Sequence, residues 1–142
     1  NQIKKVLLQM INQRQARESG LIIKEFDGSY QFTTRPAHDK YFKNLVKTSE
    51  KKLTTSALET LSIIAYKQPI TRAEIDKIRG VSSQSTVDNL MDRGLIKENG
   101  RLDKIGKPII YVTTNLFLKY FDIKDLSELP EIKEIEKDLY ED

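Results

Sequence analysis

Residues 54–121 contain one change of hydrophobic period, and this change limits the folds that the chain can adopt. Up to Gly94, apolar residues recur three or four positions apart, which predicts helices. Pro69 and Gly80 divide this part into three helical segments, because neither residue continues a helix easily. After Gly94 the pattern predicts two strands joined by a loop. Three helices followed by a β-hairpin are typical of a winged helix.

Capping residues support the three helices. Thr54 is expected to cap the first, and Thr71 and Glu74 have the spacing of a capping box at the start of the second. Ser82 or Ser83 is expected to cap the third. The residues expected to face the core are Leu58, Leu61, Ile64, Ala65, Ile75, Ile78, Val87, Leu90 and Met91.

The end of this unit has the pattern of a wing and a closing helix. Strands are predicted over residues 95–98 and 108–113, with the reversal beginning at Asn99-Gly100. A short helix with Leu116, Phe117, Tyr120 and Phe121 then closes the unit.

Residues 1–46 predict a helix, a hairpin and a second helix. The first helix spans residues 3–18, the strands 21–26 and 30–33 flank Asp27-Gly28, and a helix follows over 37–46. Its apolar stripe consists of Ile3, Val6, Leu7, Met10 and Ile11. A helix directly followed by a hairpin matches the third helix and wing of another winged helix. We therefore expect the first two helices of that domain to lie upstream of Asn1.

The resulting fold class is α+β, with two winged-helix domains in tandem and the first lacking its N-terminal helices. The expected boundaries are 1–46 for the first domain, 47–53 for a linker, 54–130 for the second domain and 131–142 for an acidic tail. The tail carries six acidic residues against Lys133 and Lys137. Ile132, Ile135 and Leu139 would share one face of a helix there, and a disordered tail is the alternative.

The composition argues against catalysis. The chain has no cysteine and one histidine, so thiolate and multi-histidine metal sites are excluded. No nucleophile with a partner base can be named, and Gly106-Lys107-Pro108 lacks the spacing of a phosphate-binding loop. No apolar run approaches the roughly 18 residues of a membrane span. We expect a cytoplasmic protein that is not an enzyme and has no metal or cofactor.

One sequence run is specific enough to suggest a family. The segment ALETLSIIAYKQPITRAEI at residues 57–75 closely resembles segregation and condensation protein B, an accessory subunit of the bacterial SMC–kleisin condensin complex. Further similar segments are 33–36, 78–81, 93–96, 106–114, 117–121 and 126–130. The resemblance spans about residues 1–130.

The resemblance implies a fold of two tandem winged helices and a role in chromosome condensation and segregation. It implies a homodimer, formed mainly through the first winged helix, that clasps the central region of the kleisin, segregation and condensation protein A. Through the kleisin it implies association with the SMC ATPase on the nucleoid. The alternative function is that of a DNA-binding transcription regulator.

Two surfaces are candidate binding sites. The family engages its kleisin through apolar surface of the second winged helix, and large apolar residues dominate interface energetics. The candidates are Tyr66, Ile70, Phe117, Tyr120, Leu126 and Leu129, with a position in the core as the alternative for each. Arg101, Lys104 and Lys107 in the wing are candidates for weak, non-specific DNA contact, with an ordinary solvated loop as the alternative.

Sequence-specific DNA recognition by the third helix is disfavoured. Its expected outward residues are Ser83, Gln84, Ser85, Asp88, Asn89, Asp92 and Arg93. Two aspartates against one arginine give this face a net negative charge. Such a face is poorly suited to duplex DNA, which is itself densely negative.

Overall fold

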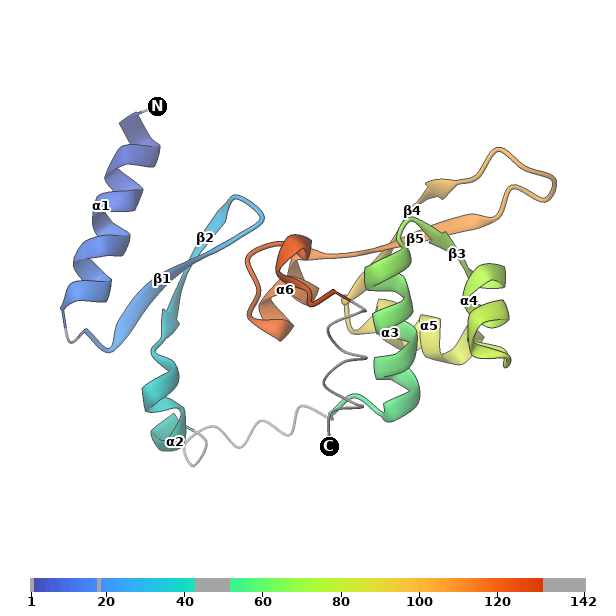
Figure 1. The fold of residues 1–142 in the computed structure, drawn as a ribbon, viewed down its shortest axis with the longest axis horizontal. Helices are drawn as coiled ribbons and strands as arrows, with labels where there is room; N and C mark the ends of the chain where they lie inside the picture. Colours follow the sequence, from blue (N-terminus) through green and yellow to red (C-terminus); the bar gives the residue numbers. More distant parts are fainter. Residues whose placement is uncertain (1, 18, 43–51, 132–142) are drawn as a thin grey trace. The chain divides into compact units, whose positions relative to one another are not determined.

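The computed structural model describes residues 2–17, 19–42 and 52–131. The chain divides into two compact units, Asn1–Lys51 and Lys52–Asp142 (Figure 1). The part of the helix predicted beyond Phe42, most of the predicted linker and nearly all of the acidic tail lie outside the described residues.

The first unit consists of a helix, a two-stranded hairpin and a short helical segment, in the predicted order. Its elements are α1 (Gln2–Ala16), β1 (Leu21–Phe26), β2 (Ser29–Thr34), a 3-10 turn (Pro36–His38) and α2 (Asp39–Phe42). The two strands are antiparallel, with Leu21 opposite Thr34 and Phe26 opposite Ser29. Asp27 and Gly28 form the tight turn, both with positive φ, as the Asp-Gly signal predicts.

The apolar stripe of α1 is not buried by the residues that the structure describes. No residue of α1 is buried, and Ile3, Val6 and Met10 are 71%, 49% and 37% exposed. Among residues 2–17 and 19–42, only β1 contributes buried side chains, through Ile23 and Phe26. The periodicity predicted the helix correctly, but the surface that would cover its apolar face is not supplied by the described residues.

Arg35 ties the end of the hairpin to the end of α1. Its guanidinium donates to the backbone oxygens of Arg14 at 2.8 Å, Gln15 at 3.1 Å and Ser19 at 2.7 Å, and also to that of Arg17. The last carbonyls of a helix have no partner within the helix and carry partial negative charge, so a cation stabilises them.

The second unit has the winged-helix arrangement (Figure 1). Its elements are α3 (Thr55–Lys67), β3 (Ile70–Thr71), α4 (Arg72–Arg79), α5 (Gln84–Asp92), β4 (Ile96–Arg101), β5 (Ile109–Thr113), α6 (Asn115–Phe121) and a 3-10 turn (Leu126–Glu128). The three strands form an antiparallel sheet in the order β3-β5-β4. The sequence did not predict β3, because two residues are too few to show a strand period.

The helix boundaries follow the predicted caps. The Thr54 hydroxyl accepts a hydrogen bond from the Ala57 amide, and Thr71 and Glu74 form the complete capping box. Gly80 ends α4 in the left-handed conformation, with φ of 71°. Ser83 stands at the start of α5 but does not cap it, since its hydroxyl bonds to Asp76 instead.

The core of this unit is built mainly from the predicted stripes, with two errors. Leu58 is 39% exposed and Ile78 is 53% exposed, although both were expected to face inward. Each lies at the margin of an apolar stripe, where helical spacing alone does not distinguish the buried face from its border. Fully buried positions include Leu61, Ile64, Ile75, Val87 and Leu90.

The wing reverses later than predicted. β4 continues through Asn99 and Gly100 to Arg101, with an irregular register between Glu98 and Arg101. Gly100 has φ of 87°, so it serves a bulge within the strand instead of starting the turn. The chain reverses between Arg101 and Ile109, where the Lys107 amide donates to the Lys104 oxygen at 2.8 Å.

Candidate protein-binding site

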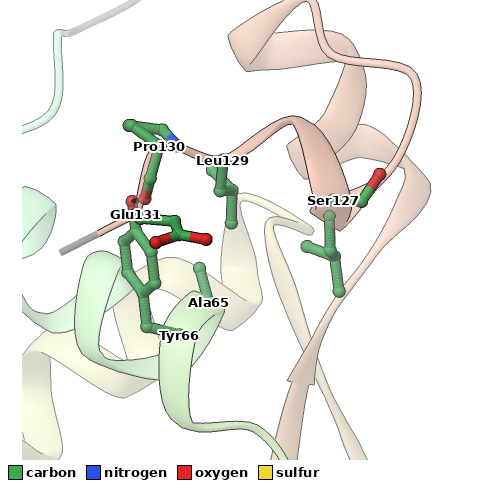
Figure 2. Close-up of a pocket in the computed structure, with 7 residues that line it drawn as sticks. Ala65, Tyr66, Ser127, Leu129, Pro130 and Glu131 are labelled. Atoms are coloured by element: carbon green, nitrogen blue, oxygen red, sulfur yellow. Dashed lines mark hydrogen bonds between the residues drawn. The ribbon is translucent and has the colours of Figure 1, made fainter. Parts of the chain in front are cut away.

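An open pocket lies between the last turn of α3 and the segment that follows α6 (Figure 2). Its volume is about 510 Å³. The lining residues are Ala65, Tyr66, Leu126, Ser127, Leu129, Pro130 and Glu131. Most of these side chains are apolar, so the pocket offers a partly hydrophobic surface for a partner side chain.

Tyr66 joins the two walls of the pocket. It is half-buried near the end of α3, and its hydroxyl donates a hydrogen bond to the Pro130 oxygen at 2.8 Å. Figure 2 shows its ring beside Pro130 and Glu131. A tyrosine suits this position because its ring supplies apolar area while its hydroxyl satisfies a backbone carbonyl.

The second wall is held by local hydrogen bonds. Asp125 accepts from the amide of Ser127 at 2.8 Å and also from its hydroxyl. The Lys124 amide donates to the Glu128 carboxylate at 2.8 Å. The bonds from Ser127 lower the pKa of Asp125 below its ordinary value. These contacts fix the short turn that presents Leu126 to the pocket.

Helix α6 determines where this wall begins. Phe117 and Leu118 are buried and anchor α6, and the Phe117 and Phe121 rings lie 4.9 Å apart. Asp122 ends the helix in the left-handed conformation, and the Ile123 amide returns to the Leu118 oxygen at 3.0 Å. The chain therefore leaves α6 through a tight reversal toward the pocket.

The structure brings three of the six predicted apolar anchors together: Tyr66, Leu126 and Leu129 line one pocket. Tyr120 is 45% exposed on α6 but does not line it. Ile70 and Phe117 were expected at an interface, but they are 4% and 2% exposed. Both are core residues in this fold, so they offer no surface to a partner.

Three lining residues were missed by sequence reasoning, since Ser127, Pro130 and Glu131 were not singled out. Ala65 is buried, as expected, and lines the pocket from α3. Segment 126–130 already stood out by its resemblance to the family, so a signal for the wall was present. Helical spacing gave no sign that this segment returns to α3.

The third helix of this unit, α5, is poorly suited to binding DNA in the structure, as its negative charge predicted. Ser83, expected to point outward, is fully buried. Its amide donates to Asp76 Oδ1 at 2.7 Å, and its hydroxyl bonds to the same oxygen. The Gln84 side chain donates to Asp88 at 2.8 Å, and Arg93 donates to the Asn89 side chain at 3.0 Å. Several polar groups of this face are therefore already engaged within the helix.

The wing carries the three predicted cations on exposed positions. Arg101, Lys104 and Lys107 are all exposed, and Arg101 donates to the Lys107 backbone oxygen at 3.1 Å. Ile105, between the two lysines, is fully exposed. This loop thus presents positive charge without a fixed geometry for reading bases.

Other kinds of site find little support in the residues described. Among residues 2–17, 19–42 and 52–131, no group of three or more histidine, cysteine, aspartate or glutamate side chains could hold a metal ion. In the same residues, no helix is long and apolar enough to cross a membrane.

Comparisons with known proteins agree with the sequence resemblance. The family described as "Segregation and condensation complex subunit ScpB" matches residues 1–132. Segregation and condensation protein B of Clostridium tetani is 41% identical over 140 residues, covering 98% of this chain and 74% of that protein. The protein of the same name from Alkaliphilus oremlandii is 44% identical over 149 residues, covering 99% and 80%.

A solved structure is also similar. The crystal structure of ScpB from Mycobacterium tuberculosis has 34% sequence identity and a TM-score of 0.49 with this chain. The match covers 84% of this chain and 75% of that one. The family match over residues 1–132 carries the assignment. The chain belongs to the family of the segregation and condensation complex subunit ScpB.

Proposed function

We propose that this protein is a non-enzymatic architectural subunit of the segregation and condensation complex, in which it binds the central region of the kleisin subunit. Family membership supports the role in that complex. The pocket formed by Tyr66, Leu126 and Leu129 is the observation that carries the binding site. Through the kleisin, the protein would associate with the SMC ATPase and act in the cytoplasm at the nucleoid.

The pocket has the character of a protein-binding site. Interfaces depend on a few large apolar or aromatic side chains seated in pockets. Here Leu126 is 40% exposed at the rim, and Tyr66 and Leu129 are half-buried within the wall. We expect the kleisin segment to place an apolar side chain between these residues and α3.

A matched pair of variants tests this site. Leu126→Asp places a charge in the pocket and is expected to abolish co-purification with the central region of the kleisin. Leu116→Asp is the control, since Leu116 is 49% exposed but does not line the pocket. Equal unfolding temperatures would show that both variants fold. Unchanged kleisin binding by the folded Leu126→Asp variant would contradict the proposed site.

We also propose that the protein is a homodimer and that its first unit is the third helix and wing of a first winged helix. The uncovered stripe of α1 supports both statements, because a helix with an exposed apolar face needs a partner surface. A neighbouring helix pair of the same domain or a second copy would provide such a surface.

Two equally exposed residues of α1 provide the test of the dimer. Val6 and Leu8 are both 49% exposed, but only Val6 lies on the predicted stripe. Val6→Asp is expected to shift the mass measured by light scattering toward the monomer, whereas Leu8→Asp should leave it unchanged. A monomeric wild-type chain, or identical masses for wild type and both variants, would argue against dimerisation through this face.

A further inference from the structure

The geometry points to a second occupant of the pocket at Tyr66: the chain's own C-terminal segment, residues 132–142, covering the surface that we propose for the kleisin. The regulatory part of this inference rests on the proposed function, whereas the docking itself does not. Glu131 lines the pocket, so residue 132 follows directly from its wall. No linker separates the segment from the surface that it would cover.

The exposed surface continues from the pocket along α3. Leu58, Ser62, Ala65 and Tyr66 are spaced by three or four residues, so they share one face of the helix. Ala65 and Tyr66 line the pocket, where Ala65 is buried and Tyr66 is half-buried. Ser62 is exposed and Leu58 is 39% exposed. Leu58, unexpectedly exposed in the described residues, is therefore part of a strip that leads away from the pocket.

The segment has a matching apolar pattern. Ile132, Ile135 and Leu139 are three and four positions apart and would form one stripe of a helix. Glu134 and Lys137 would lie on its opposite side and remain in water. An amphipathic segment of this kind is suited to packing against a single apolar surface.

The two stripes also agree in length. Eight residues separate Leu58 from Tyr66, which corresponds to about 12 Å along a helix. Seven residues separate Ile132 from Leu139, which corresponds to about 10 Å if the segment is helical. Running from Tyr66 toward the start of α3, the segment would place Ile132 near Tyr66 and Leu139 near Leu58.

Covalent attachment favours this occupant over a free partner. A segment tethered by a short connection acts at an effective concentration of about a millimolar, so even weak docking leaves it bound much of the time. A kleisin segment would then bind only the fraction of molecules in which the strip is open, which lowers its apparent affinity by that fraction.

The absence of cysteine makes a direct test simple, because only introduced thiols can form a disulfide. Ser62 lies four residues before Tyr66, and Glu136 lies four residues after Ile132, at the border of the apolar stripe. The Ser62→Cys/Glu136→Cys pair in the full chain is expected to oxidise at least about tenfold faster than Lys104→Cys/Glu136→Cys, whose first thiol is in the wing. Intact mass and gels without reductant measure the reaction.

Docking through the apolar stripe predicts how further changes affect this reaction. Ile135→Asp/Leu139→Asp in the Ser62→Cys/Glu136→Cys background should slow oxidation to the rate of the wing pair. Lys137→Gln removes a positive charge from the opposite side of the segment. It should leave the fast oxidation of the Ser62→Cys/Glu136→Cys pair unchanged. Equal rates for the α3 and wing pairs, or a fast rate that survives the double aspartate change, would overturn the inference.

Competition is measured separately with the recombinant central region of the kleisin. Ile135→Asp/Leu139→Asp in the cysteine-free chain should raise the affinity about fivefold or more, while Lys137→Gln should not change it. Rapid oxidation of the α3 pair without any kleisin binding would support docking and refute the proposed function. Kleisin binding together with equal oxidation rates would support the proposed function and refute docking. Docking without any change in kleisin affinity in the double aspartate variant would refute competition.

Discussion

Asp76 on α4 and Ser83 at the start of α5 are joined through one carboxylate oxygen, which accepts hydrogen bonds from both the amide and the hydroxyl of Ser83. Ser83 is fully buried, so these bonds satisfy polar groups that water does not reach. The pair fixes the turn between the two helices. Sequence reasoning assigned Ser83 to a cap, because a serine before a helix usually has that role.

The link between Asp76 and Ser83 predicts a dependence of stability on pH. Hydrogen bonds from Ser83 lower the pKa of Asp76 below its ordinary 3.8. A group whose pKa is lowered by folding contributes stability above its unfolded pKa and loses it as pH falls through the folded pKa. Asp76→Asn should therefore lower the unfolding temperature at pH 7, and its difference from wild type should shrink below about pH 4.

Asp103→Asn is the matched control for this measurement, because Asp103 is an exposed carboxylate in the wing. It should leave the unfolding temperature close to that of the wild type across the same pH range. A constant difference between Asp76→Asn and wild type from pH 7 to pH 3 would show that the Asp76 charge does not stabilise the turn.

The capping box of α4 predicts a measurable loss when its hydroxyl is removed. The Thr71 hydroxyl donates to the Glu74 carboxylate at 2.7 Å and accepts from the Glu74 amide at 3.4 Å. Thr71→Ala should lower the free energy of unfolding by about 1 kcal/mol, or roughly 4–8 °C for a unit of this size. Thr71→Ser keeps the hydroxyl and should recover most of the loss in calorimetry. Equal losses for the two variants would assign the effect to packing.

Arg35 should control the local stability of the first unit. Arg35→Ala removes a guanidinium that donates to four backbone oxygens at and beyond the end of α1. We expect amide exchange in β1 to become about tenfold faster, which corresponds to about 1.4 kcal/mol. Arg35→Lys should restore only part of the protection, because an ammonium lacks the planar fork.

Lys5→Ala removes a charge from an exposed position of α1 and should leave exchange in β1 unchanged. Similar protection in Arg35→Ala and wild type would mean that the hairpin holds α1 without the guanidinium. Complete recovery in Arg35→Lys would mean that charge alone is sufficient.

The sequence predicted elements better than it predicted surfaces. The capping box, the Asp-Gly turn and the glycine at the end of α4 are local signals, and each occurs where it was expected. The roles of Asp76 and Ser83 depend on how one helix packs against the next, which neither residue reveals alone. The same limit applies to Ile70 and Phe117, since large apolar residues are equally suitable for a core and for an interface.

Part of the pocket could be predicted from the sequence, and part of it could not. Tyr66, Leu126 and Leu129 were proposed because they are large, apolar and within similar segments, and the structure places them around one cavity. Ala65 and Pro130 complete it only because the chain reverses after α6. The reversal depends on Asp122 in a left-handed conformation, for which an aspartate gives a weak signal.

The wing supplies the last prediction, which concerns DNA. We expect weak duplex binding without sequence preference through Arg101, Lys104 and Lys107, since all three are exposed and the face of α5 is poorly suited to it. Changing all three to Glu should abolish binding measured by fluorescence anisotropy at low salt. Each phosphate contact contributes about 0.9 to the slope of log affinity against log salt, so the wild-type slope should be no steeper than about 3.

The matched control changes three other lysines to Glu, so that it alters the net charge by the same amount. These are Lys67, Lys77 and Lys119, which are exposed on α3, α4 and α6. This variant should bind more weakly than wild type through general electrostatics, yet it should bind better than the wing variant. Equal affinities for the two triple variants would show that the wing makes no direct contact.

Asn89→Ala should have no effect on affinity, because base readout by α5 is not part of this binding. A strong preference of the wild type for one DNA sequence, lost in Asn89→Ala, would instead favour the transcription regulator.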